Sequence, residues 1–337
     1  MKNLKKTTLI LTILSFLTLF TSANAEIKVV ASIKPIHSLA SYLMDGVGKP
    51  SLIVDGYASP HGFAMKPSHA KMLQDADIVF WVGEDLENFL EKPLDSIAKK
   101  AEKIELLETK GLIKLKFRER NIFDDHDDHG HDDGHKKKDD HDDHDHDDHA
   151  KKEDGHDDHD DHDDHEGHNH GEFDPHIWLD PINAKVILFE MSKHLIENDP
   201  KNENAYRTNL SKAYKEIDKL TSDVTAELNQ SVASIVFHDA YQYFEKRFNV
   251  NILGAFTVNT DVMPGAEQLS EIREIIEHDK VVCVFSEPQF NPDIIKAVAK
   301  DMNIKTGVVD PLGATLNPSK DLYFDLIKIM SKSFKGC

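Results

Sequence analysis

The chain has 337 residues, 39% of them hydrophobic, which allows two ordinary domains, or one with insertions, and argues against a polytopic membrane protein. Its formal net charge is −21, and residues 124–172 alone contribute −18, through 23 Asp and Glu against 5 Lys. The acidity therefore belongs to one segment, and because phosphate binding needs basic patches, we expect no nucleic-acid partner.

The first 25 residues predict a secretory signal peptide. A basic start, "MKNLKK", precedes the apolar run "LILTILSFLTLF", and "ANA" at 23–25 has the small-x-small form of a cleavage site. The apolar run is too short to span a bilayer comfortably. We expect cleavage after Ala25, so that the mature protein begins at Glu26 outside the cytoplasm.

Short apolar runs alternate with amphipathic stretches in the first part of the mature chain. The pattern predicts strands over 27–32, 51–54, 77–83 and 104–107, with helices over 35–46, 67–76 and from about 84 to 102. This alternation indicates a parallel α/β sheet. Two helical stretches follow the acidic segment, over 182–197 and 201–230. The second has no Gly or Pro and would be ~40 Å long.

The same alternation resumes after residue 230. It predicts strands over 234–237, 251–256, 281–287 and 305–311, and helices over 240–248, 266–279, 292–302 and 319–333. We therefore expect two α/β lobes with parallel sheets. Their predicted boundaries are 26–200 for the first lobe, with 124–172 as an insertion, 201–230 for a connecting helix, and 231–337 for the second lobe.

The two cysteines are Cys283, in an apolar run, and Cys337, the last residue. In an oxidising compartment a disulfide between them is expected, although two free thiols are the alternative. Such a bond would close a loop of 54 residues, worth roughly 4 kcal/mol on the chain-entropy model.

Three histidines outside the acidic segment have settings that suit a ligand site. His61 lies in a loop with Pro and Gly, His176 lies between two Asp-Pro steps, and His238 ends a predicted strand. Asp310 ends the last predicted strand, and ligands bind at the carboxyl ends of strands in open α/β sheets. Three imidazoles and a carboxylate suit Zn²⁺, whereas Mn²⁺ would favour more oxygen ligands.

Each of these residues taken alone could be an ordinary surface or capping residue. Four further histidines lie in predicted helices and are expected to have no role in metal binding, namely His37, His69, His194 and His278. Catalysis is not expected, because HExxH, CxxC and GxSxG are absent. Only Glu287 and Asp239 could be nominated as a general base.

The chain resembles the zinc-specific solute-binding proteins of high-affinity zinc-uptake ABC transporters, in the cluster A-I metal-binding group. The resemblance covers about residues 29–313 and is carried by "ASIKPIHSLA", "SPHGFAMKPS", "DPHIWLDP", "VFHDAYQYFEKRF", "VFSEPQF" and "VVDPLG". It implies two α/β lobes joined by a long rigid helix, with the metal in the cleft between them. It also supports the Cys283–Cys337 disulfide.

The family's ligand histidines fall on His61, His176 and His238. Some members have a carboxylate immediately before the first of these, but here that residue is Pro60, which cannot bind a metal. The resemblance therefore leaves Asp310, which matches the position used by other members, or a water molecule as the fourth ligand.

The function that the resemblance implies is capture of Zn²⁺ in the periplasm and its delivery to an inner-membrane ABC permease with a cytoplasmic ATPase. We expect a monomer in which zinc is a transported ligand, with small lobe movements on loading. The alternatives are a binding protein for Mn²⁺ or Ni²⁺, or a zinc-sequestering buffer or adhesin that has no permease.

Residues 126–170 hold 14 of the 21 histidines, mostly in repeats of "HDDH". So few apolar residues cannot offset the conformational entropy of ordering, so this His/Asp tract is expected to be disordered without metal. We expect it to be a weak zinc-collecting or zinc-sensing arm, and a merely solvated acidic linker is the alternative. Its candidate ligands are His126, His129, His131, His135, His141, His144, His146, His149, His156, His159, His162, His165, His168 and His170.

Overall fold

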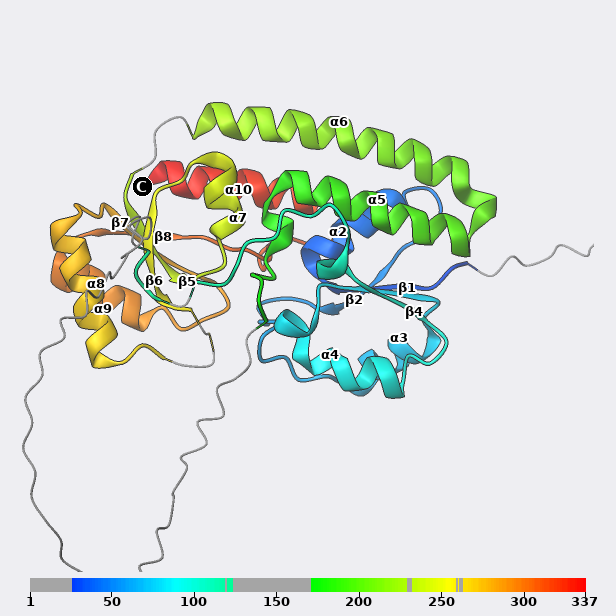
Figure 1. Cartoon of the computed structure of the whole chain (residues 1–337), viewed down its shortest axis with the longest axis horizontal. Coiled ribbons are helices and arrows are strands. Elements are labelled where there is room, and N and C mark those ends of the chain that lie inside the picture. The colour runs from blue at the N-terminus through cyan, green and yellow to red at the C-terminus, as the bar shows by residue number, and fades with distance from the viewer. Residues whose placement is uncertain (1–25, 119, 124–170, 229–231, 259, 261–262) are drawn as a thin grey trace, which may run out of the picture.

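The computed structural model describes residues 26–118, 120–123, 171–228, 232–258, 260 and 263–337 (Figure 1). The expected signal peptide and every histidine of the His/Asp tract lie outside the described residues. The described part of the chain contains two parallel four-stranded sheets with helices packed on them. The predicted α/β class with two parallel sheets is therefore confirmed.

The first sheet has the strand order β2-β1-β3-β4. Its central strand β1 is buried on both faces, which is typical of a parallel sheet covered by helices. The strands are β1 (Val29–Ile33), β2 (Ser51–Val54), β3 (Ile78–Trp81) and β4 (Glu102–Glu105). The helices between them are α2 (Lys34–Leu43), α3 (Pro67–Asp75) and α4 (Glu84–Ser96).

The second sheet repeats that order as β6-β5-β7-β8. Its strands are β5 (Ser234–His238), β6 (Ile252–Thr257), β7 (Cys283–Ser286) and β8 (Lys305–Val308). Its helices are α7 (Gln242–Phe248), α8 (Ala266–His278), α9 (Asp293–Met302) and α10 (Leu322–Gly336). Strands β7 and β8 end earlier than predicted, so Glu287 and Asp310 follow their strands at the carboxyl edge of the sheet.

The connection between the sheets is helical. It consists of α5 (Pro181–Asn198), a 3₁₀ turn (Pro200–Asn202) and α6 (Glu203–Glu227). The 25 residues of α6 make one continuous helix of ~37 Å that packs on α5, α10 and α2, and it extends over both lobes in Figure 1. No helix of the described residues is both long and apolar enough to cross a membrane. The exact domain boundaries stay a prediction.

One apolar core joins the two sheets. It includes Ile33 of β1 and Phe285 of β7, and a second, smaller core lies between the second sheet and helices α8 and α9. Trp178 connects the lobes by donating its indole N–H to the carbonyl of Pro311 at 2.8 Å. Tyr323 of α10 in turn donates its hydroxyl to the carbonyl of Trp178 at 3.0 Å. A shared apolar core and buried hydrogen bonds therefore hold the two lobes together.

The described residues that flank the His/Asp tract are attached to different lobes. Before the tract, the chain crosses to the second sheet, where Phe123 N donates to the carbonyl of Leu253 in β6 at 2.9 Å. After the tract, Gly171 N donates to Asp85 Oδ1 at 2.9 Å, at the start of α4 in the first lobe. The last described residue before the tract is therefore held by the second lobe, and the first one after it is held by the first lobe.

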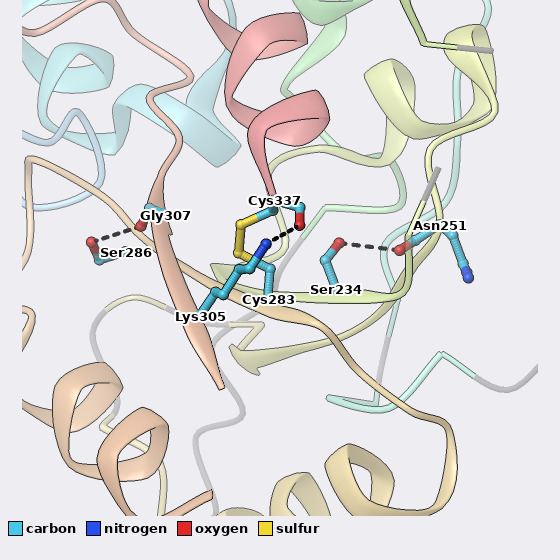
Figure 2. The surroundings of a disulfide bond; sticks show 7 residues. All are labelled: Ser234, Asn251, Cys283, Ser286, Lys305, Gly307 and Cys337. Carbon is cyan, nitrogen blue, oxygen red and sulfur yellow. Dashed lines mark hydrogen bonds between the residues drawn. A yellow bond between two sulfur atoms is a disulfide. The ribbon is translucent and has the colours of Figure 1, made fainter. Parts of the chain in front are cut away.

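A disulfide joins Cys283 of β7 to Cys337, at the end of α10 (Figure 2). Lys305 Nζ also donates to the carbonyl of Cys337, at 3.3 Å. The predicted disulfide is therefore present, and it attaches the end of the chain to the second sheet.

Candidate metal centre

Three histidines from separate parts of the chain converge between the lobes. His61 lies in the loop between β2 and α3, His176 directly precedes the 3₁₀ turn Ile177–Leu179, and His238 is the last residue of β5. One ring nitrogen from each lies within 4.8 Å of the others. The ring centroids are 5.4 to 5.8 Å apart. The structure thus brings together three of the four residues that the sequence nominated.

The cavity between these rings is very small. Its volume is about 10 Å³, which is near the minimum for one water molecule and leaves no room for an organic solute. It is lined by Ser59, Pro60, His61, Leu86, His176, Trp178, His238, Glu287, Gln289, Phe290, Pro311 and Leu312. Residues from both lobes therefore enclose a space suited to a single ion.

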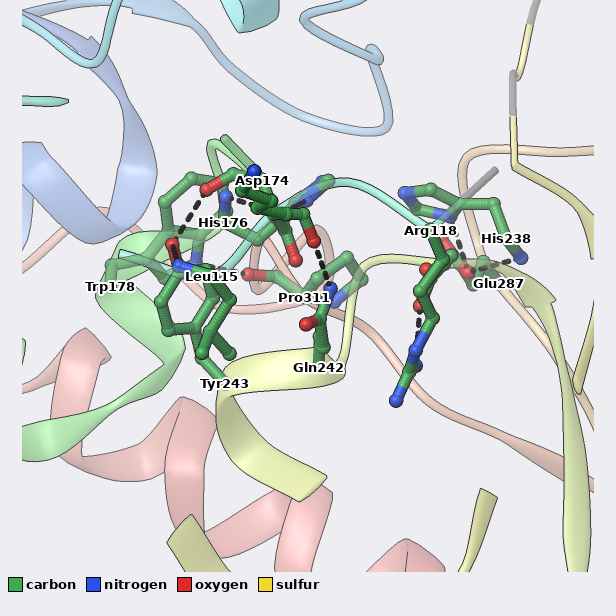
Figure 3. A network of polar contacts seen from close by, with 12 residues as sticks. Leu115, Arg118, Asp174, His176, Trp178, His238, Gln242, Tyr243, Glu287 and Pro311 are labelled. Carbon is green, nitrogen blue, oxygen red and sulfur yellow. Dashed lines mark hydrogen bonds and ion pairs between the residues drawn. The ribbon is translucent and has the colours of Figure 1, made fainter. Parts of the chain in front are cut away.

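Asp174 fixes the orientation of the His176 imidazole. Its Oδ1 accepts from the ring Nδ1 of His176 at 2.7 Å and from the backbone N–H of His176 at 2.9 Å (Figure 3). Because the carboxylate accepts this bond, Nδ1 carries the proton and Nε2 keeps a lone pair for a metal. The spacing of two residues in "DPH" was a signal for this pair that sequence reasoning missed.

Glu287 does the same for His238. Its Oε1 accepts from the ring Nδ1 at 2.6 Å, and both side chains are buried (Figure 3). The His238 Nε2 is buried and has no hydrogen-bond partner among the described residues. A buried lone pair without a donor is suited to a cation. Glu287 was nominated from the sequence as a candidate general base. In the structure its carboxylate accepts a hydrogen bond from the His238 ring.

The electrostatic environment differs between the two rings. Burial holds the pKa of His176 well below its ordinary value, so this imidazole stays neutral and able to bind a metal. Burial also depresses the pKa of His238, but the nearby carboxylates, chiefly Glu287, outweigh that effect and raise it overall. Burial raises the pKa of Asp174 to about 7. Protons therefore compete with a metal more strongly at His238 than at His176.

Arg118 connects the segment before the tract to this site. Its guanidinium donates to Asp239 Oδ1 at 3.0 Å and to Glu245 Oε2 at 2.7 Å. Asp239 follows His238 directly, so Arg118 balances a carboxylate beside a candidate ligand. Asp239 is thus part of an ion pair, and sequence reasoning did not identify Arg118, which lies 121 residues from its partner.

Asp310, the predicted fourth ligand, is not part of the histidine group. Its oxygens are outside the set of ligand atoms within 4.8 Å of one another, and the residue does not line the cavity. Instead its carboxylate accepts four hydrogen bonds, from the backbone N–H groups of Leu312, Gly313 and Ala314 and from Gln289 Nε2. In this structure Asp310 organises a loop, and its direct role as a ligand stays a prediction.

The remaining described histidines lie away from the centre. His37 contacts the carbonyl of Pro50, His69 accepts the backbone N–H of Lys66 at the start of α3, and His278 is exposed on α8. His194 forms a second group of possible metal ligands with Glu102 and Glu197. Both of its ring nitrogens already contact carboxylates, those of Glu102 and Glu190. Hydrogen bonding thus accounts for His194 without a metal.

Known proteins of one family match nearly the whole chain. The family model described as "Zinc-uptake complex component A periplasmic" matches residues 29–337. The High-affinity zinc uptake system protein ZnuA of Brucella abortus (strain 2308) is 46% identical over 312 residues, covering 92% of this chain and 91% of that protein. Its counterpart of the same name in Yersinia pestis is 35% identical, covering 93% and 92%.

Solved structures share the fold. A zinc-bound ZnuA deletion mutant superposes with a TM-score of 0.69 at 19% identity, covering 92% of this chain and 97% of that one. The laminin-binding protein Lmb of Streptococcus agalactiae superposes with a TM-score of 0.68 at 21% identity, covering 92% and 100%. From the family model and the sequence relatives, the chain belongs to the ZnuA family of periplasmic zinc-uptake components.

Proposed function

We propose that the protein captures Zn²⁺ in the periplasm, between His61, His176 and His238, and delivers it to an inner-membrane ABC permease with its cytoplasmic ATPase. The observation that carries this proposal is the convergence of three imidazoles on a cavity of about 10 Å³. Zinc is the transported ligand, so the site has to bind and release it without chemical turnover.

The donor set favours zinc over harder ions. Imidazole nitrogen is a good ligand for Zn²⁺, whereas Mn²⁺ prefers carboxylate, carbonyl and water oxygens. The carboxylates of Asp174 and Glu287 accept from the Nδ1 atoms of His176 and His238. This fixes the orientation of both rings, which supports tight binding. The names of the relatives, as high-affinity zinc uptake proteins, support the same cargo.

Contacts between the lobes support the expectation of small movements on loading. Lys34, at the start of α2, is buried and donates to the carbonyls of Gly313, Ala314 and Leu316 in the second lobe. Together with the shared apolar core, these bonds would have to break in a large hinge motion. We therefore propose that release involves local loops and competition from the permease.

The His/Asp tract is proposed as an accessory arm that raises the local zinc concentration. Support comes from the described residues beside it, because Arg118 contacts Asp239 and Asp174 contacts His176. The chain thus leaves the metal centre shortly before the tract and returns to it shortly afterwards. The net charge of −18 over 124–172 would also attract cations.

Growth under zinc limitation tests the proposal. A host lacking the protein is grown with a zinc chelator and complemented with the full-length wild type, His176→Ala, or His278→Ala as an exposed control. We expect the wild type and the control to restore growth, His176→Ala to fail, and added zinc to rescue every strain. Normal growth of the deletion strain would favour a buffer or adhesin, and rescue by manganese alone would show another cargo.

A further inference from the structure

Gln289 lies in the turn after β7, two residues beyond Glu287, and it lines the cavity between the three histidines. Its side-chain nitrogen Nε2 donates to Asp310 Oδ1 at 2.8 Å. Gln289 is thus a neutral polar residue at the edge of the cavity, beside the three imidazoles.

The hydrogen bond to Asp310 fixes which end of the amide faces the cavity. A carboxylate can only accept, so the NH₂ end of Gln289 must be the end that faces Asp310. The carbonyl oxygen Oε1 is then turned away from Asp310. It is buried and has no hydrogen-bond partner among the described residues. A buried carbonyl oxygen of this kind calls for a donor or a cation.

Asp310 is well placed to hold the amide still. Its carboxylate is itself anchored by the N–H groups of Leu312, Gly313 and Ala314, at 3.0, 3.0 and 2.6 Å. Lys34 holds the same loop from the first lobe through its carbonyls. If Asp310 moved to the ion, its hydrogen bonds to these backbone N–H groups would break. Gln289 can stay where it is and keep its hydrogen bond to Asp310.

We propose that the side-chain carbonyl oxygen of Gln289 is the fourth protein donor to the captured ion, and that Asp310 positions it from behind. This inference rests on the proposed function. The resulting set is three neutral imidazoles and one neutral amide, so the bound ion keeps its full charge. Pro60, next to His61, offers no side-chain donor. Glu287 also lines the cavity, but its Oε1 accepts from His238 Nδ1, so among these residues Gln289 is the one with a neutral oxygen donor that no histidine engages.

Cobalt(II) substitution tests this assignment, because its visible spectrum reports the number and type of ligands. The proteins compared are the wild type, Gln289→Leu, and Gln74→Leu as an exposed control on α3. With Gln289 bound, azide should not change the wild-type spectrum. In Gln289→Leu a water should enter, so azide should bind and change the spectrum, and the zinc Kd should rise about 10- to 100-fold.

Gln289→Asn, which keeps the amide but shortens its reach, should behave as Gln289→Leu does, and near-ultraviolet circular dichroism of the metal-free proteins checks the fold. An azide response in the wild type equal to that of Gln289→Leu, with zinc Kd values within about twofold, would overturn the assignment. If His176→Ala loses tight binding while Gln289→Leu does not, the three-imidazole site stands and the role of Gln289 alone is refuted.

Discussion

Glu87 gives a stability test that needs no metal. This carboxyl group is completely buried in the first lobe, on α4. Its Oε2 accepts the backbone N–H groups of Val82 at 2.9 Å and Gly83 at 3.0 Å. Burial outweighs these bonds and raises the pKa of Glu87 from 4.5 to about 7.

A raised pKa means that the folded state binds this proton more tightly than the unfolded state does. The free energy of unfolding therefore falls as pH rises from about 4.5 to about 7. One pKa unit corresponds to about 1.4 kcal/mol, so the difference between pH 5 and pH 8 is about 2 to 3 kcal/mol. Glu87→Gln has no carboxyl group that can ionise, so it should lack this loss of stability. Its amide oxygen can still accept both backbone N–H groups.

The assay is urea unfolding of the metal-free proteins at pH 5 and pH 8. The stability of Glu87→Gln relative to wild type should increase by about 2 to 3 kcal/mol between the two pH values. Other titrating groups are shared by both proteins and cancel in this difference. Glu91→Gln, exposed on the same helix, should show no such change. An equal stability difference at both pH values would refute the reasoning.

Three further outcomes follow from the structure. Glu287→Gln removes the carboxylate that accepts from His238 Nδ1, so the zinc Kd should rise about 10- to 100-fold in a chelator competition titration. An unchanged Kd would contradict this role of Glu287. Replacing Cys283 and Cys337 together by alanine should lower the free energy of unfolding by about 4 kcal/mol in urea, and no loss would show that the disulfide is dispensable. Replacing residues 124–170 by a Gly-Ser linker should remove weakly bound zinc in equilibrium dialysis but keep the tight site, whose loss would move the centre into the tract.

Much of the fold could be predicted from the sequence because hydrophobic periodicity is a local signal. The strand over 51–54 was located to the residue, and the connecting helix was predicted over 201–230 against an observed Glu203–Glu227. For the α-helices and strands the errors lay at the ends of elements, and the 3₁₀ turns of the described residues were not predicted. The strand predicted over 305–311 ends at Val308, where Asp310 begins to accept hydrogen bonds from its own loop.

The candidate site could be predicted only in part. His61, His176 and His238 could be nominated from loop and strand-end positions, and the structure brings them together. The groups around them were found less completely, because the "DPH" signal for Asp174 was missed and Glu287 was nominated in another role. Arg118 reaches Asp239 across 121 residues, and the role of Gln289 depends on which atom of its amide faces Asp310. Such contacts depend on tertiary packing and leave no periodic trace in the sequence.

The central claim is that three histidines between the lobes hold the ion. Its most direct test is a zinc competition titration of the metal-free wild type beside His61→Ala, His176→Ala and His238→Ala, with His278→Ala as the exposed control. Each of the three variants should weaken the tightest site by more than about 100-fold, and the control should match the wild type. If none of the three weakens that site, the metal is bound elsewhere and the account is wrong.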